Sequence, residues 1–249
     1  VVPVEEVRVG DRLMGPDSEP REVLATNVGF GPLWRITPVK GDSWVCNDVH
    51  VLTLAGTNRR MGETIDIPLN ELIKRETSCG RRIDRDWKLM RTGVNFYRRE
   101  VPVDPYLLGL WIGDGTTAEV SITNCEPEIR DYCRSIAHKY GAELVEREDA
   151  DNNTWNLRFR VAEKASRVDH TNVLRRFFLN DCQCGDGKRI PDDYLYNDEA
   201  TRLALLAGIV DTDGFLDTGS IALTTVSPVL RDQYLYLARS LGLAAYARE

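Results

Sequence analysis

The sequence contains an internal duplication with a spacing of 101 residues, and this feature constrains the fold more than any other. When the chain is shifted by 101 residues, Val120–Asn124 aligns with Ile221–Thr225, and the similarity continues beyond them. A repeat of this length indicates two similar modules related by a pseudo-two-fold axis. The later matches are Pro127 with Pro228, Arg130-Asp131 with Arg231-Asp232, Ala137 with Ala238, and Gly141 with Gly242.

Each copy is expected to begin with a buried helix that ends at an Asp-Gly pair. The first helix has a clear start, because Asp104 can cap it and Pro105 suits the first helical position. The second helix is expected to start near Asn197 or Asp198. Their apolar runs have no polar face, which indicates that both helices are buried. These runs are Leu107–Ile112 and Leu206–Val210, and the pairs Asp114-Gly115 and Asp213-Gly214 lie 99 residues apart, which leaves a two-residue insertion in the second turn.

Small residues repeat four positions apart on both helices, as Gly109 with Gly113 and Gly208 with Thr212. This spacing lets two helix backbones approach closely. A two-fold pair would place two carboxylates side by side at negative helix ends, which is costly unless a cation neutralises them. Carboxylate oxygens suit Mg²⁺ or Mn²⁺, and such sites assist phosphodiester cleavage. Two core helices with simple Asp-Gly turns are the alternative.

The charge is distributed unevenly along the chain. The whole sequence has a formal net charge of −7, but residues 59–99 contain 11 Lys and Arg against 6 Asp and Glu, a net of +5. Basic pairs such as Arg81-Arg82 alternate with aromatic residues, including Trp87 and Phe96. This mixture favours contact with a nucleic-acid strand. It is also typical of a solvated linker.

The segments Leu107–Gly115 (LLGLWIGDG) and Leu206–Gly214 (LAGIVDTDG) resemble the two signature helices of LAGLIDADG homing endonucleases, and Asp104–Thr117 resembles the form found inside inteins. The resemblance implies that Asp114 and Asp213 bind the catalytic Mg²⁺ or Mn²⁺. It also implies that Lys188, within Lys188-Arg189-Ile190-Pro191, acts near the scissile phosphate, where a lysine can orient water or offset developing charge. An ordinary loop lysine is the alternative reading of Lys188.

The first part of the chain resembles the splicing domain of inteins. Val4–Asp17 and Pro20–Val23 resemble the opening strands of the Hedgehog/intein (Hint) fold. Trp44–His50 resembles the second splicing motif in its Asn-x-x-His form, the type found in the yeast vacuolar ATPase intein. The resemblance implies that His50 assists the acyl shift at the splice junction and that Asn47 supports it. A histidine with a purely structural role is the alternative.

We therefore expect a mixed fold: a partial all-β Hint splicing domain at 1–58, a basic DNA-contacting insertion or linker at 59–100, and a pseudo-two-fold α/β LAGLIDADG domain at 101–249. The strand expected at 154–161 presents Asn156, Arg158 and Arg160 on one face, which suits double-stranded DNA. Solvation alone would also explain that face. Arg81 and Arg82 are further candidate DNA contacts. The expected partners are a double-stranded DNA target site and the host protein's exteins, bound by a monomer.

The complete protein is expected to extend beyond both ends of this sequence. The first copy continues well past Gly141, whereas only seven residues follow Gly242, and the stretch contains neither an N-terminal nucleophile nor a His-Asn end. We therefore do not expect residues 1–249 alone to splice. The six cysteines suggest a reducing compartment rather than a disulfide scaffold, so we expect the nucleus or cytoplasm, depending on the host. No apolar run is long enough for a membrane span, so no membrane partner is expected.

Two other functions fit the same sequence. The first is a splicing element whose endonuclease has decayed into a scaffold. The second is a DNA-binding regulator or maturase that uses the paired helices without cutting. The first predicts that Asp114 and Asp213 are dispensable, and the second predicts tight DNA binding without metal-dependent cleavage.

Overall fold

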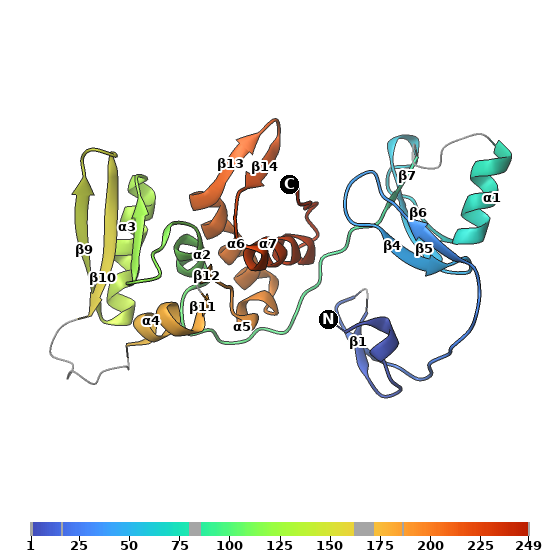
Figure 1. Cartoon of the computed structure of the whole chain (residues 1–249), viewed down its shortest axis with the longest axis horizontal. Coiled ribbons are helices and arrows are strands. Elements are labelled where there is room, and N and C mark those ends of the chain that lie inside the picture. Colours follow the sequence, from blue (N-terminus) through green and yellow to red (C-terminus); the bar gives the residue numbers. More distant parts are fainter. Residues whose placement is uncertain (1, 16, 80–85, 162–171, 186, 249) are drawn as a thin grey trace. The chain divides into compact units, whose positions relative to one another are not determined.

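The computed structural model describes residues 2–15, 17–79, 86–161, 172–185 and 187–248, and the chain forms two compact units (Figure 1). Unit 1 comprises Val1–Val94 together with Gly242–Glu249, and unit 2 comprises Asn95–Leu241. Arg81 and Arg82, which we expected to contact DNA, lie outside the described residues. None of the helices in the described ranges is long and apolar enough to cross a membrane.

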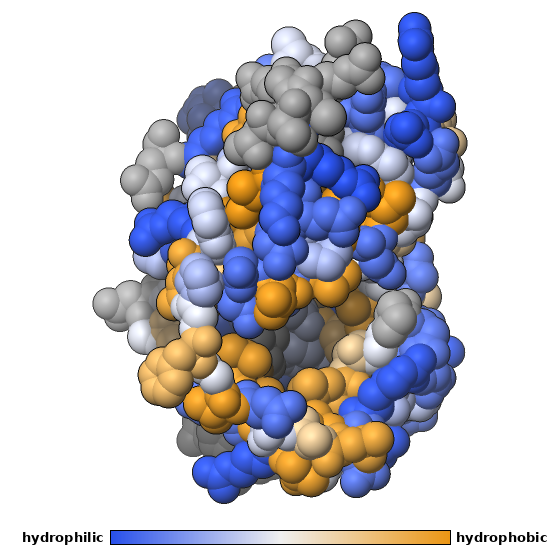
Figure 2. Space-filling model, turned by 90° about the vertical axis from the view of Figure 1, so that its right-hand side faces the viewer, coloured by the Kyte–Doolittle hydropathy of each residue, from blue (hydrophilic) through white to orange (hydrophobic). Residues whose placement is uncertain are grey.

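The strands of unit 1 are short and antiparallel. Its small core comes from alternation along β5, where Leu52 and Leu54 are buried while Val51 is exposed. Many other large apolar side chains of this unit are exposed, among them Val28 and Phe30, and Figure 2 shows such hydrophobic surface in orange. The elements are β1 (Arg12–Met14) paired with β2 (Pro20–Glu22), β3 (Leu33–Ile36) paired with β4 (Trp44–Asn47), β5 (Val51–Gly56) between β6 (Thr64–Pro68) and β7 (Trp87–Leu89), helix α1 (Leu69–Cys79), and the 3-10 turns η1 (Val4–Glu6) and η2 (Asn58–Arg60).

The boundaries of unit 1 differ from those expected from charge and repeat pattern. Within residues 59–94, the strands β6 and β7 pair with the two edges of β5. The C-terminal residues 242–248 also belong to unit 1. There the Arg91 guanidinium donates a 3.1 Å hydrogen bond to the Tyr246 hydroxyl. The net charge of a segment indicates how it interacts with water and with charged partners. The pairing of its strands determines which other segments it folds with.

Unit 2 contains both copies of the duplication. The first copy contains a three-stranded antiparallel sheet, with strand order β8-β10-β9, that packs against α3 (Figure 1). Its elements are α2 (Pro105–Asp114), β8 (Ser121–Asn124), α3 (Pro127–Ala137), η4 (His138–Tyr140), β9 (Ala142–Asp149), β10 (Thr154–Val161), α4 (Val173–Arg176), the π-helical turn η5 (Phe177–Asp181), β11 (Gln183–Cys184) and β12 (Gly187–Lys188). The second copy follows with α5 (Asp192–Leu195), α6 (Glu199–Asp213), β13 (Gly214–Asp217), β14 (Ser220–Leu223) and α7 (Pro228–Ser240).

The order of elements confirms the duplication: α2, β8 and α3 correspond to α6, β14 and α7. In the second copy, Gly214 pairs with Leu223 as part of a hairpin; in the first, Gly115 and Ile122 make only an isolated bridge. The two extra residues lie in the turn of that hairpin. Gly141 and Gly242, which follow α3 and α7, both have positive φ, of 61° and 79°. Glycine adopts that conformation at little cost, which explains its place in both copies.

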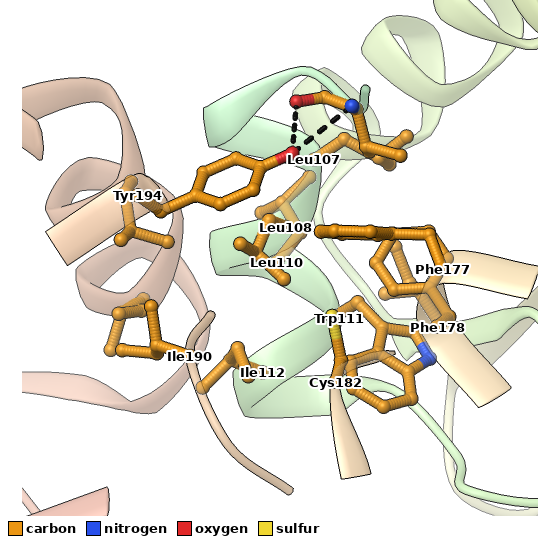
Figure 3. Close-up of a cluster of buried hydrophobic side chains, with 14 of the residues drawn as sticks. Leu107, Leu108, Leu110, Trp111, Ile112, Phe177, Phe178, Cys182, Ile190 and Tyr194 are labelled. Carbon is orange, nitrogen blue, oxygen red and sulfur yellow. Dashed lines mark hydrogen bonds between the residues drawn. The ribbon is translucent and has the colours of Figure 1, made fainter. Parts of the chain in front are cut away.

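Helix α2 is the centre of the core of unit 2. Leu107, Leu108, Leu110 and Trp111 are fully buried, and Figure 3 shows them among side chains from η5 and α5. The predicted start of α2 is confirmed, because the Asp104 carboxylate accepts hydrogen bonds from the first backbone N–H groups of the helix. Asp198 caps α6 in the same way. The core is completed by Phe177, Phe178, Cys182, Ile190 and Tyr194, whose hydroxyl bonds to the backbone of Val103.

Candidate active site

The two Asp-ending helices, α2 and α6, pack directly against each other through glycines. A Cβ atom on Gly109 would lie 2.4 Å from the Leu205 carbonyl oxygen, and one on Gly208 would lie 2.3 Å from the Tyr106 carbonyl oxygen. Gly109 and Gly208 are equivalent in the two copies, so their mutual contact is what a two-fold relation requires. Neither position can hold a side chain unless the helices move apart.

Asp114 and Asp213 are the last residues of α2 and α6, and both are half-buried. A Cβ atom on Gly113 would lie 3.2 Å from Asp213 Cγ, so the last turn of α2 contacts Asp213. Burial raises the pKa of both carboxyls, and the charge of Asp114 raises the pKa of Asp213 further. The structure therefore brings the two predicted acids to one place, where their charges oppose each other.

Lys188 lies near the two acids, and its ammonium group makes a specific contact with the end of α2. Its Nζ donates three hydrogen bonds to the carbonyls of Trp111, Ile112 and Gly113, at 2.9, 2.9 and 3.0 Å. These are the last carbonyls of α2, so Lys188 caps the C-terminal end of that helix. Burial lowers the pKa of Lys188 to about 8, against the opposing effects of Asp213 and Asp114.

Asn124 is a site residue that sequence reasoning missed. Its amide donates a 2.6 Å hydrogen bond to the Asp114 carboxylate, which lowers the pKa of that carboxyl against the larger effect of burial. The duplication could have pointed to Asn124, because this residue ends one of the best-matched segments of the repeat. Its equivalent, Thr225, has no amide group. The Asn124 and Thr225 side chains both accept the backbone N–H two residues later, just before α3 and α7.

Tyr234 on α7 is a second residue that the sequence did not reveal. Its side chain is buried, and its hydroxyl has no hydrogen-bond partner among the described residues. Burial raises the pKa of Tyr234, and the charge of Asp213 raises it further. A buried hydroxyl without a partner is unusual and costs stability. No periodic or motif signal in the sequence distinguishes it from a core tyrosine.

The donor set at the helix ends consists of two carboxylates and backbone carbonyls. Within the described ranges, no cluster of three or more His, Cys, Asp or Glu side chains is close enough to hold a metal ion. Mg²⁺ is commonly held by one or two carboxylates, with water and phosphate oxygens completing its coordination. Asp114 and Asp213 fit this pattern, and a divalent cation would relieve the repulsion between them.

The strand face expected to contact DNA is present on β10. Asn156, Arg158 and Arg160 alternate with residues of the opposite face, where Leu157 and Phe159 are buried. Each arginine is paired with an acidic residue: Arg158 with Glu119 at 3.0 Å, and Arg160 with Glu143 at 2.8 Å. Exposed ion pairs contribute little, about 0–1 kcal/mol. Neither ion pair therefore contributes much to the stability of the fold.

In unit 1, the structure brings Asn47 and His50 to the two ends of one tight turn between β4 and β5. The backbone N–H of His50 donates to the Asn47 carbonyl at 3.3 Å, and both side chains are exposed. The His50 carbonyl accepts a 2.9 Å hydrogen bond from Leu69, which anchors the end of the turn. The turn thus holds the imidazole and the amide on accessible neighbouring positions.

Comparison with known protein families finds a match that includes most of the second copy. Residues 189–249 match the family model for the homing endonuclease. The matched range includes α6, the β13–β14 hairpin and α7, and therefore contains Asp213. Asp114 and Lys188 lie outside it. This part of the chain is therefore similar to homing endonucleases.

Two curated relatives extend the similarity over more of the chain. The replicative DNA helicase DnaB of Mycobacterium intracellulare is 29% identical over 233 residues, which is 86% of this chain and 35% of the relative. The homothallic switching endonuclease of Saccharomyces cerevisiae is 26% identical over 159 residues, which is 56% of this chain and 27% of the relative. The chain therefore spans about a third and about a quarter of these relatives. The second relative supports a DNA endonuclease.

Proposed function

We propose that this chain is part of an intein whose unit 2 is a divalent-metal-dependent DNA endonuclease of the LAGLIDADG type. The observation that carries the proposal is the meeting of Asp114, Asp213 and Lys188 at the ends of two equivalent, closely packed helices. The match of residues 189–249 to a homing endonuclease supports the same function. The substrate is double-stranded DNA, because two equivalent modules suit the two strands of a duplex.

The chemistry proposed for the site is hydrolysis of a phosphodiester. Asp114 and Asp213 would hold Mg²⁺ or Mn²⁺, which supplies charge stabilisation for the attacking and leaving oxygens. Lys188 keeps a positive charge next to the two acids and offsets negative charge that develops on the phosphate. Asn124 holds the Asp114 carboxylate in one orientation. The β10 face, with Asn156, Arg158 and Arg160, lies along the DNA and exchanges its carboxylate partners for phosphates or base edges.

Unit 1 is proposed to be part of a Hint-type splicing domain, with the host protein supplying the exteins. The similarity to a replicative DNA helicase over most of this chain suggests that the host is such a helicase. His50 would protonate the amide nitrogen at the splice junction, and Asn47 would support it. The exposed turn that carries both side chains is compatible with access to a scissile peptide bond.

Cleavage by the full-length protein tests the endonuclease. The substrate is a plasmid that carries a replicative helicase gene without the insertion, and a plasmid without that gene is the control. We expect linear product with Mg²⁺, none with EDTA, and none from the Asp114→Asn variant. Tight binding without cleavage, or no effect of Asp114→Asn together with Asp213→Asn, would instead support a non-cleaving DNA-binding protein or a decayed endonuclease.

Splicing is tested separately, with the full-length protein between two reporter domains. We expect ligated reporters, and accumulation of precursor in the His50→Ala variant. Splicing that is unaffected by His50→Ala would contradict the role given to this residue. Asp114→Asn is the matched control, because it changes the other unit.

A further inference from the structure

The Gln233 side chain on α7 holds the backbone of Ile190 through two hydrogen bonds. The Ile190 N–H donates to Gln233 Oε1 at 2.8 Å, and Gln233 Nε2 donates to the Ile190 carbonyl at 2.7 Å. A side-chain amide that bonds both groups of one residue reproduces the pairing made by a neighbouring strand. Neither the duplication nor any motif in the sequence singles out Gln233.

Ile190 follows Lys188 by two residues, so this clamp lies close to the lysine along the chain. Two extended residues span at most about 7 Å. Ile190 is itself buried in the core of unit 2, and the backbone N–H of the intervening Arg189 donates to the Cys182 carbonyl at 2.8 Å. The segment that carries Lys188 is therefore held on one side by the first copy and on the other by α7 of the second copy.

The position of the Lys188 ammonium group depends strongly on this backbone. A lysine side chain loses most of its rotamer freedom when it is fixed in one position. Its three hydrogen bonds to the end of α2 all fall within 2.9–3.0 Å, which requires a fixed starting point for the side chain. A displacement of Ile190 would move that point and break some of these bonds.

We propose that Gln233 is a positioning residue for Lys188: it fixes the Lys188–Ile190 segment from the second copy, so that the ammonium group stays on the last carbonyls of α2. The copy that supplies Asp213 thereby also controls the lysine that lies beside Asp114. The effect on DNA cleavage rests on the proposed function, whereas the effect on the ammonium group does not.

The first test measures hydrogen exchange between the Lys188 ammonium group and water in the full-length protein, without metal or DNA. In protein labelled with ¹⁵N-lysine, the Lys188 ammonium signal is identified by its loss in Lys188→Met, and its hydrogen bonds slow its exchange with water. In Gln233→Leu, which removes both hydrogen bonds at similar size, we expect at least tenfold faster exchange of this signal and of the Ile190 amide. Asp232→Asn, an exposed neighbour on the same helix, is the control. An unchanged Lys188 signal in folded Gln233→Leu would overturn the proposal.

A conservative variant separates positioning from general damage to the fold. Gln233→Glu keeps the size, but the ionised carboxylate has no donor for the Ile190 carbonyl. Protonation restores one donor and one acceptor, so we expect slow exchange of the Lys188 signal to return as the pH falls towards about 4.3. Gln233→Leu should show no such recovery. The same exchange rate of the Lys188 signal in both variants across this pH range would contradict the proposed role of Gln233.

Cleavage kinetics then test the consequence for function, on the helicase-gene plasmid. Substitution of a residue that holds a functional side chain in place typically lowers activity 10–100-fold. We therefore expect a loss of this size in kcat for Gln233→Leu, with little change in KM. Combined with Lys188→Met, it should cause no further loss, because Gln233 acts through the lysine. Additive losses would overturn the proposal. Absence of cleavage by the unsubstituted protein would refute the proposed function, while the exchange measurements would still decide the role of Gln233.

Discussion

The Asn124 amide donates a 2.6 Å hydrogen bond to the Asp114 carboxylate, and the equivalent position in the second copy is a threonine. The two acids therefore differ in their surroundings although they end equivalent helices. Asp114 has a neutral donor that favours its ionised form, whereas the charge of Asp114 makes ionisation of Asp213 harder. The site is symmetric in its backbone and asymmetric in its electrostatics.

Exchanging the two equivalent residues should shift these acids in opposite directions. Asn124→Thr removes the donor, so we expect the pKa of the Asp114 carboxyl to rise. Thr225→Asn adds an amide at the equivalent position, so we expect the pKa of Asp213 to fall. Titration of ¹³C-labelled aspartate by NMR measures both values in metal-free protein. Shifts of the same sign in the two variants would contradict the equivalence.

Replacing Asp213 by Asn should stabilise the metal-free protein at neutral pH. Burial and the charge of Asp114 raise the pKa of Asp213 in the folded state above its ordinary value of 3.8. The folded state therefore binds more protons than the unfolded state above that value, and stability is lost as the pH rises through this window. In urea unfolding with EDTA, the free energy of unfolding of the Asp213→Asn variant should increase relative to that of the unsubstituted protein from pH 3 to pH 7. A constant difference across this range would be the contrary result, and added Mg²⁺ should reverse the order.

Lys188 should produce a pH dependence in the alkaline range. Burial lowers its pKa from 10.5 to about 8 in the folded state. Between these two values the unfolded state binds more protons, so stability rises with pH, because the cost of the buried charge disappears. The difference in unfolding free energy between the unsubstituted protein and Lys188→Met should therefore increase from pH 8 to pH 10.5. Other titrating groups are common to both proteins and cancel.

Adding one methyl group at the helix contact should be highly disruptive. In Gly109→Ala, the new Cβ would lie 2.4 Å from the Leu205 carbonyl oxygen, so α2 and α6 must separate. Overpacking of this kind costs about 1–3 kcal/mol, and the separation should also abolish cleavage. Gly187→Ala is the matched control, since its nearest neighbour lies at 3.8 Å. Chemical denaturation of both variants measures the effect, and equal midpoints would contradict the tight contact.

Removal of the Tyr234 hydroxyl should stabilise the protein, in contrast to the substitution at Gly109. Because the hydroxyl is buried without a partner among the described residues, Tyr234→Phe should raise stability by about 1 kcal/mol. Tyr194→Phe is the matched control, since that hydroxyl bonds to both backbone groups of Val103, at 2.6 and 3.0 Å. The control should lose about 1–3 kcal/mol. Thermal unfolding distinguishes the two, and a loss of stability in Tyr234→Phe would mean that its hydroxyl has a partner.

Much of unit 2 was predictable because its signals are local and repeated. The cap at Asp104, the apolar run after it and the matched Gly positions are enough to predict two helices and their contact. The alternation of Leu157 and Phe159 with Arg158 likewise predicts the strand. These features depend on backbone sterics and burial within a few residues, which a sequence displays directly.

The remaining features depend on contacts between distant segments. The roles of Asn124 and Gln233 follow from partners 10 and 43 residues away, and nothing in their own neighbourhood indicates these partners. The extent of unit 1 was also not apparent, because the pairing of β6 and β7 with β5 is a long-range choice that charge does not report. The basic composition of this stretch therefore indicated its charge, but not that β6 and β7 pair with β5.

The glycine contact between α2 and α6 also determines how this protein can change over time. One small surface holds the two copies together and spaces the two acids, so a substitution there alters folding and chemistry at once. The β10 face, by contrast, carries Arg158 and Arg160 on exposed positions and Asn156 on a half-buried one, none of which belongs to the core. On the proposed function, residues on this strand can therefore be exchanged, and the DNA sequence preference changed with them, while the helix contact remains fixed.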